Sequence, residues 1–284
     1  MTDTSYSYEL PVARLLTYGD CRKLPAWPEK LDYLPLDFES EHIPDLIRMA
    51  TDEELLWADS ESLEVWAPIH AWRVLGQLRA EAAVGPLLSL FRLVDDEDDD
   101  WIGEDMPEVF GLIGPAAIPA LLTYILDPMH GLWAKVNAAD AIGKIAEKHP
   151  AAKPACIAAL VEALEQYEDN DPTVNAFIIS SLLNLKAASA AQLMERAFAA
   201  DAVDLSVAGD WEEVQIEMGW KIKRETPIPA GGWLAAEERR DGSTLADYRS
   251  AQPQPRQVKT TPQKAKAKVK RKQAAKSRKR NRKK

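Results

Sequence analysis

The stretch WAPIHAWRVLGQLRAEAAVGPLLSLF, residues 66–91, sets the pattern for most of this chain. Each half carries four apolar residues at positions i, i+3, i+4 and i+7, a spacing that forms one stripe on an α-helix. The two stripes are Ala71, Val74, Leu75, Leu78 and Val84, Leu87, Leu88, Phe91. Residues 79–83 between them are too few for anything but a tight reversal. The stretch therefore predicts two antiparallel helices that face each other, an αα-hairpin.

Neither helix of one hairpin can bury its stripe alone, so recurrence of the unit decides the architecture. Further first-helix stripes are Met106, Val109, Phe110, Ile113; Ala138, Ala141, Ile142, Ile145; and Ile178, Ser181, Leu182, Leu185. Further second-helix stripes are Ile43, Leu46, Ile47, Ala50; Ile118, Leu121, Leu122, Ile125; Ile157, Leu160, Val161, Leu164; and Ala190, Leu193, Met194, Ala197. The second-helix stripes begin 33 to 41 residues apart, as in helical repeats. The sequence predicts an all-α solenoid of about four to five hairpins.

Turn and capping residues fall between the stripes. Gly114 followed by Pro115 predicts a helix end with a left-handed glycine, and then a new helix. Two Asp-Pro pairs predict helix starts at the third and fourth repeats, and one Thr-Glu pair predicts a capping box. These pairs are Asp127 with Pro128, Asp171 with Pro172, and Thr51 with Glu54.

Three glycines lie inside predicted first helices: Gly76, Gly111 and Gly143. A glycine inside a helix costs roughly 1 kcal/mol relative to alanine. Its return in three repeats therefore predicts that a neighbouring helix approaches the backbone closely.

Several segments of this predicted array resemble known helical repeats. LGQL at residues 75–78 and EAAVGPLL at residues 81–88 resemble the HEAT-like repeat first named from phycobilisome lyases. EHIPDLI at residues 41–47 and WAPIHAW at residues 66–72 resemble bacterial HEAT-like repeat proteins. The resemblance covers about residues 40 to 200 and implies an α-solenoid. Members of the bacterial group often end in a cysteine-rich zinc motif similar to that of the SecA translocase, which this chain lacks, so no zinc role is implied.

Composition and patterning favour a soluble cytoplasmic protein. No long alternating run of β-branched or aromatic residues predicts a strand among the 284 residues, of which 46% are apolar. Cys21 and Cys156 give no disulfide framework or metal-ligand spacing, as is typical of reduced thiols. Residues 1–14 lack a secretion signal, and no apolar run reaches about 18 residues. We expect no membrane segment and no cofactor.

The chain divides into five predicted regions. Residues 1–35 are an N-terminal arm over the first repeat, residues 36–200 form the array, and residues 201–225 close it with a short helix. Residues 226–252 are a linker with one weak helix, and residues 253–284 are a disordered basic tail. The net charge of −10 averages opposed regions, because residues 1–252 carry 20 cations against 45 anions, whereas the tail holds 15 Lys and Arg and no acid.

Three tryptophans, Trp66, Trp101 and Trp133, each lie five residues before a first-helix stripe begins. That offset places each ring away from the stripe, on the flank or outer side of its helix. Two interpretations stay open. In one, each ring wedges between successive repeats. In the other, the rings are partly exposed anchors for a protein partner, because tryptophan is enriched in interface hot spots.

Six consecutive acids are expected in a loop between repeats: Asp95, Asp96, Glu97, Asp98, Asp99 and Asp100. A calcium loop does not fit, because its sixth position requires a glycine and holds Asp100 when the loop starts at Asp95. The remaining interpretations are a solvated loop and a docking site for a basic partner, including the chain's own tail.

The end of the tail, residues 264–284, holds 13 cations and no aromatic residue. This charge density predicts salt-dependent, sequence-independent contact with nucleic acid, the ribosome or another polyanion. An acidic protein surface, the body of the same chain, and no specific role are the alternatives. In a eukaryotic host, residues 276–284 also match a nuclear import signal. The cations are Lys264, Lys266, Lys268, Lys270, Arg271, Lys272, Lys276, Arg278, Lys279, Arg280, Arg282, Lys283 and Lys284.

No catalytic motif stands out. The histidines are scattered, without the His-Glu pairs of iron-binding HEAT-like hydroxylases, and phosphate loops and nucleophile elbows are absent. The leading hypothesis is a non-enzymatic scaffold that binds a protein through the inner face formed by the second helices. An alternative, suggested by the resemblance alone, is a lyase or chaperone-lyase for a bilin or similar ligand, which requires a polar pocket. A nucleic-acid-binding array, as in HEAT-like DNA glycosylases, is disfavoured by the acidic repeats. The histidines are His42, His70, His130 and His149.

Overall fold

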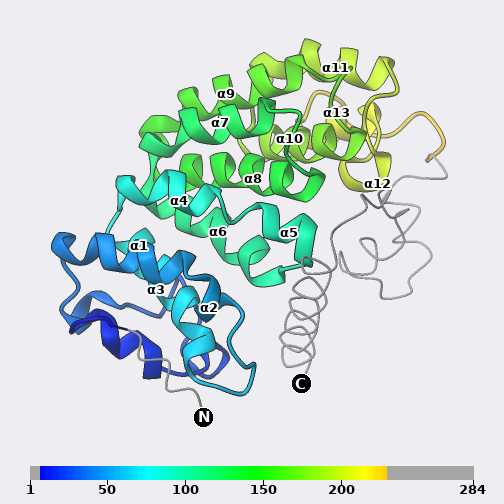
Figure 1. The fold of residues 1–284 in the computed structure, drawn as a ribbon. Helices are drawn as coiled ribbons and strands as arrows, with labels where there is room; N and C mark the ends of the chain where they lie inside the picture. Colours follow the sequence, from blue (N-terminus) through cyan, green and yellow to red (C-terminus); the bar gives the residue numbers. More distant parts are fainter. Residues whose placement is uncertain (1–6, 229–284) are drawn as a thin grey trace, which may run out of the picture.

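The computed structural model describes residues 7–228, and over that range the chain forms helices and turns without any strand (Figure 1). The all-α prediction is therefore confirmed. The predicted linker helix and the basic tail lie outside the described residues. No single helix between residues 7 and 228 is long and apolar enough to cross a membrane; α6 and α7 reach that composition only together, as a pair bent by 112°.

The helices pack in two layers in chain order (Figure 1). The first layer contains α3 (Ala67–Gln77), α6 (Asp100–Ile113), α8 (Leu132–Lys148) and α10 (Pro172–Asn184). The second layer contains α1 (Ile43–Thr51), α4 (Val84–Leu88), α7 (Ile118–Leu126), α9 (Lys153–Glu165) and α11 (Ala191–Ala199). Short helices complete the body: α2 (Glu53–Leu56), α5 (Arg92–Glu97), α12 (Leu205–Ala208) and α13 (Trp211–Glu217).

A 3₁₀ turn leads into every second-layer helix. The five turns, in chain order, are η4 (Ser40–His42), η6 (Glu81–Ala83), η7 (Pro115–Ala117), η8 (Pro150–Ala152) and η9 (Ala188–Ala190). The same local structure therefore returns in each unit, although the units differ in length. The remaining 3₁₀ turns are η1 (Val12–Thr17), η2 (Cys21–Lys23), η3 (Leu34–Leu36) and η5 (Glu64–Trp66).

The apolar stripes form the core between the layers. All of the predicted stripe residues are buried except six that are partly buried, namely Ile43, Ile47, Leu78, Leu122, Ile157 and Val161. One element differs from expectation, because the second helix of the 66–91 hairpin ends at Leu88 and α5 follows it after a turn. Phe91 is nevertheless buried and contacts Phe110 of α6, with ring centroids 5.5 Å apart.

Two of the three helical glycines allow close packing, as predicted. A Cβ at Gly111 would lie 2.9 Å from the Cβ of Lys144 in α8, and one at Gly76 would lie 3.3 Å from the Leu112 side chain and 3.4 Å from the Val109 backbone, both in α6. Gly143 differs, because its nearest neighbour would be the Ser181 Oγ at 3.6 Å, an ordinary contact. The prediction is confirmed for α3 and α6 and is wrong for α8.

The predicted helix starts are only partly correct. Asp171 caps α10 by accepting a hydrogen bond from the Thr173 N–H at 2.8 Å, as predicted. Asp127 does not cap α8, which begins at Leu132; its carboxylate accepts from the Met129 N–H at 2.8 Å in the preceding turn.

Two further turn predictions need correction. Thr51 ends α1, and Asp52 caps α2, so no Thr51–Glu54 capping box forms. Gly114 has the predicted positive φ of 98°, but its ψ of −159° lies outside the left-handed helical region, in a region that is essentially restricted to glycine.

Buried and partly buried hydrogen bonds join the N-terminal arm to α3. The Tyr33 hydroxyl lies 2.7 Å from His70 Nδ1, and His70 Nε2 lies 2.8 Å from the Gly19 carbonyl oxygen. Gln77 accepts from the Tyr33 N–H at 2.8 Å and donates to the Leu31 carbonyl at 2.9 Å. Burial lowers the pKa of His70 to about 4, so the ring is neutral at physiological pH.

A buried ion pair joins α3 to α6. The Arg73 guanidinium donates to both carboxylate oxygens of Asp105, at 2.7 and 3.1 Å, and the Trp72 indole N–H donates to the same carboxylate at 3.0 Å. Both charged side chains are buried. The polar groups of Trp72, Arg73 and Asp105 thus satisfy one another, as a low-dielectric interior requires.

Candidate functional site

The three predicted tryptophans lie between neighbouring helices of the first layer. Trp66, at the end of η5, is buried and packs edge to face with Trp101 of α6, with ring centroids 5.5 Å apart. Trp133 of α8 packs in the same way with Phe177 of α10, at 6.1 Å. Trp101 and Trp133 are partly exposed. These rings join successive units, as the first interpretation expects, and the anchoring of a protein partner stays a prediction.

The acidic run does not form a loop. Asp95, Asp96 and Glu97 belong to α5, Asp98 makes a left-handed turn with φ of 54°, and Asp99 caps α6 by accepting from the N–H groups of Trp101 and Ile102. The loop prediction is wrong because aspartate is itself a preferred N-cap residue, so the run supplies a helix end and a helix start. Glu97 and Asp99 are buried, which leaves Asp96 and Asp98 as the exposed members of the run.

Asp95 caps a helix far from it in sequence. Its two carboxylate oxygens accept from the backbone N–H groups of Trp133 and Ala134, each at 2.9 Å, in the first turn of α8. A Cβ at Gly131 would overlap the Asp95 carboxyl, so the glycine makes room for this contact. Asp95 therefore caps the N-terminus of α8, the role that the sequence assigns to Asp127. Its negative charge stabilises the positive end of the helix dipole.

A small ionic cluster joins α6 to α8 on the first layer. The Glu108 carboxylate forms ion pairs with Lys144 Nζ at 2.9 Å and with Lys148 Nζ at 2.7 Å. Burial alone would raise the pKa of Glu108, but the hydrogen bonds from the two lysines lower it below its ordinary value. Crowding by surrounding protein raises the pKa of the nearby Asp140 carboxyl, and Lys144 opposes that shift. Both lysines are therefore engaged in ion pairs within the body.

Residues 154–220 form one acidic region of the described chain, with 12 Asp and Glu against 2 Lys and Arg. Two of its loops are joined by one buried side chain, Asn175. The Asn175 amide donates to the Tyr167 carbonyl at 2.9 Å, in the loop before α10, and to the Ala202 carbonyl at 2.8 Å, in the loop after α11. The Asp204 N–H also donates to the Pro172 carbonyl, at 3.1 Å.

This junction places exposed acids from both loops on one edge of the body. Glu168 and Asp169 lie on the first loop and Asp201 on the second, and none of the three makes an ion pair within residues 7–228. We call these three residues the acidic edge. The sequence shows the lack of cations between Lys153 and Lys186, but the pairing of the loops depends on Asn175, which no motif identifies.

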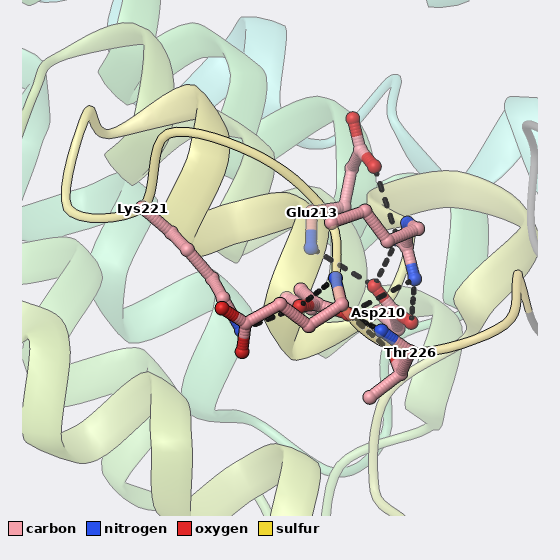
Figure 2. A network of polar contacts seen from close by, with 7 residues as sticks. Asp210, Glu213, Lys221 and Thr226 are labelled. Atoms are coloured by element: carbon pink, nitrogen blue, oxygen red, sulfur yellow. Dashed lines mark hydrogen bonds and ion pairs between the residues drawn. The ribbon is translucent and has the colours of Figure 1, made fainter.

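The described chain ends in a cluster of ion pairs over the first turn of α13 (Figure 2). Arg224 donates to both carboxylate oxygens of Asp210, at 2.8 and 2.6 Å, and to Glu213 at 3.0 Å. The hydrogen bond and charge of Arg224 hold the pKa of Asp210 below its ordinary value. Asp210 is also the N-cap of α13, since it accepts from the Glu213 N–H at 2.9 Å.

Glu212 binds the same segment from the other side. Its buried carboxylate accepts from Lys221 Nζ at 2.5 Å, from the Thr226 N–H at 2.9 Å and from the Thr226 hydroxyl. Hydrogen bonds from Lys221 and Thr226 lower the pKa of Glu212 well below its ordinary range. We call this cluster the terminal clasp; it consists of Asp210, Glu212, Glu213, Lys221, Arg224 and Thr226. The clasp fixes residues 221–226 to the body just before the chain continues toward the tail.

His130, His149 and the two cysteines make structural contacts or are buried. His149 Nε2 lies 3.1 Å from the Gly111 carbonyl oxygen, and His130 stacks on Tyr124 with ring centroids 3.5 Å apart. Cys21 and Cys156 are buried free thiols, and burial raises their pKa values to about 12 and about 11. No group of three or more His, Cys, Asp or Glu side chains in the described part of the chain is placed to hold a metal ion.

The 13 tail cations from Lys264 to Lys284 lie beyond residue 228 and outside the described residues. Comparison of the chain with protein families, with curated proteins and with solved structures found no match.

Proposed function

We propose that this protein is a non-enzymatic scaffold or adaptor built as a HEAT-like α-solenoid, and that it binds a basic protein partner while its tail holds it on nucleic acid, the ribosome or another polyanion. The observation that carries the proposal is the serial two-layer packing of helices, with a 3₁₀ turn before every second-layer helix. Repeating units of this kind present extended binding surfaces.

The net negative charge of the body favours a basic partner. Residues 7–228 contain 40 Asp and Glu against 17 Lys and Arg. A body with this excess attracts cations and speeds the association of a basic protein. The tail has the opposite charge, so it favours a different class of target, a polyanion.

The acidic edge is the part of the body that we expect a basic partner to contact. It lies at the C-terminal ends of α9 and α11, both in the second layer, where helix dipoles add negative potential to the carboxylates. Asn175 holds the two loops together, so little ordering is required on binding. The contact surface then extends from this edge along the second-layer helices.

The placement of the titratable groups also supports binding over catalysis. Two buried groups are engaged in structural contacts. His70 forms hydrogen bonds with Tyr33 and the Gly19 carbonyl, and Arg73 forms an ion pair with Asp105. The exposed acids of the edge stay available to a partner.

Affinity capture with matched charge reversals tests this proposal. The edge variant carries Glu168→Lys, Asp169→Lys and Asp201→Lys. The control carries Glu9→Lys, Glu29→Lys and Glu81→Lys, which change the net charge equally at exposed positions elsewhere. We expect a protein captured by the natural chain to be kept by the control and by a chain ending at residue 252, and to be lost from the edge variant. Equal capture by the edge and control variants, with both folded by circular dichroism, would show that the edge is not the contact surface.

A further inference from the structure

A row of aromatic rings reaches the surface at the C-terminal end of the array. Phe198 of α11 packs on Trp211 of α13 with ring centroids 5.9 Å apart, and Trp211 packs on Trp220 at 6.0 Å. Trp220 is 42% exposed, and Ile222, two residues further, is 99% exposed. We call Trp220 and Ile222 the terminal apolar patch.

The terminal clasp holds this patch in place. Lys221 is bound to Glu212, and Arg224 is bound to Asp210, so Ile222 lies between two anchored residues. It is therefore presented to solvent by a fixed segment. The end of a repeat array needs a polar outer surface to stay soluble. Trp220 and Ile222 instead expose apolar side chains there.

We propose that residues 233–238 of the same chain, with the sequence WLAAEE, cover the terminal apolar patch. Only residues 227–232 separate Thr226, the last residue held by the clasp, from Trp233. Seven Cα steps span at most about 25 Å, and the linker contains two prolines and two glycines, which favour a reversal. Such a short connection gives the segment an effective concentration near the patch in the millimolar range.

The chemistry of the segment matches the patch. Trp233 and Leu234 supply two large apolar side chains, and Glu237 and Glu238 follow three and four residues after Leu234. Lys223, next to Ile222, is exposed and makes no ion pair with any residue from 7 to 228. The basic end of the tail is a poorer occupant, because it lacks aromatic residues and shares the charge of Lys223. A second copy of the chain at micromolar concentration competes poorly with a tethered segment.

Thiol reactivity at position 222 measures whether the patch is covered. Ile222→Cys introduces an exposed thiol into a chain whose native cysteines are buried. We expect this thiol to react at least roughly tenfold more slowly in the full chain than in a chain ending at residue 228, since burying an apolar side chain such as that of Leu234 favours the covered state by about that factor or more. Met129→Cys, at a site that is 85% exposed in the turn between α7 and α8, should react equally fast in both chains.

A second variant keeps the full length of the chain. Trp233→Asp with Leu234→Asp should restore fast reaction at position 222 without truncation. Equal rates in the full and shortened chains would overturn the proposal. So would protection that persists in the double-aspartate variant, which would assign another segment. Protection that disappears on dilution would assign a second copy instead.

Discussion

Close approach of α6 and α8 at Gly111 makes alanine substitution a sensitive test of how the first layer packs. Alanine in place of glycine inside a helix gains roughly 1 kcal/mol of stability when space allows. At Gly111 the new Cβ would meet the Lys144 Cβ at 2.9 Å, an atom fixed to the backbone of α8. At Gly143 it would meet only the Ser181 side chain, with Oγ at 3.6 Å and Cβ at 3.8 Å.

These distances give opposite expected results for two chemically identical changes. Overpacking costs about 1 to 3 kcal/mol, so Gly111→Ala should be destabilised by up to about 2 kcal/mol after the gain in helix propensity is included. Gly143→Ala should be stabilised by about 1 kcal/mol, or about 2 to 4 °C in melting temperature.

Urea unfolding of both variants beside the natural chain measures the difference directly, with thermal melting as a second measurement. The midpoint should fall for Gly111→Ala and rise for Gly143→Ala. If Gly111→Ala proved as stable as Gly143→Ala, then α6 and α8 would not be in the contact described, and the packing of the first layer would need a different explanation.

Three further predictions concern buried and clasped charges. Asp105→Ala leaves Arg73 and the Trp72 indole N–H without their acceptor, so we expect a loss of about 3 to 5 kcal/mol in urea unfolding; a loss below about 1 kcal/mol, as for an exposed pair, would contradict the burial. Asp95→Ala removes the acceptor for two N–H groups of α8, so stability should fall by about 1 to 2 kcal/mol and the first turn of α8 should exchange amide hydrogens faster; unchanged exchange would refute this cap. Since the pKa of Glu212 is lowered in the folded chain, the clasp contributes stability above the ordinary glutamate pKa of about 4.3 and loses it as the pH falls below that value. The stability difference between the natural chain and Glu212→Gln should therefore shrink between about pH 6 and about pH 3, and a constant difference would contradict it.

The sequence predicts the helical core well, because apolar residues at i, i+3, i+4 and i+7 lie on one face of a helix and are buried together. Leu75, Phe110 and Ile142 are buried as their i, i+3, i+4 neighbours indicate. Glycine inside a helix also carried information, since Gly76 and Gly111 lie at close contacts.

Helix ends and sites that depend on distant residues were harder to predict. Asp127 has the local pattern of an N-cap, yet Asp95 caps α8 from 38 residues away, and nothing local reveals that competition. The terminal clasp depends on Arg224 folding back onto Asp210, and the acidic edge depends on Asn175 joining two loops. Such contacts are set by how elements pack, which single-residue patterns do not encode.

The central claim is that the basic tail binds polyanions and the acidic body does not. Binding to double-stranded DNA at several salt concentrations, measured with the full chain and with a chain ending at residue 252, tests it most directly. The account predicts that the full chain binds at low salt and weakens steeply, with a log–log slope of up to about −12 if all 13 cations from Lys264 to Lys284 neutralise phosphates. It predicts no binding by the shortened chain. Equal affinity of the two chains, or binding that salt does not change, would contradict it.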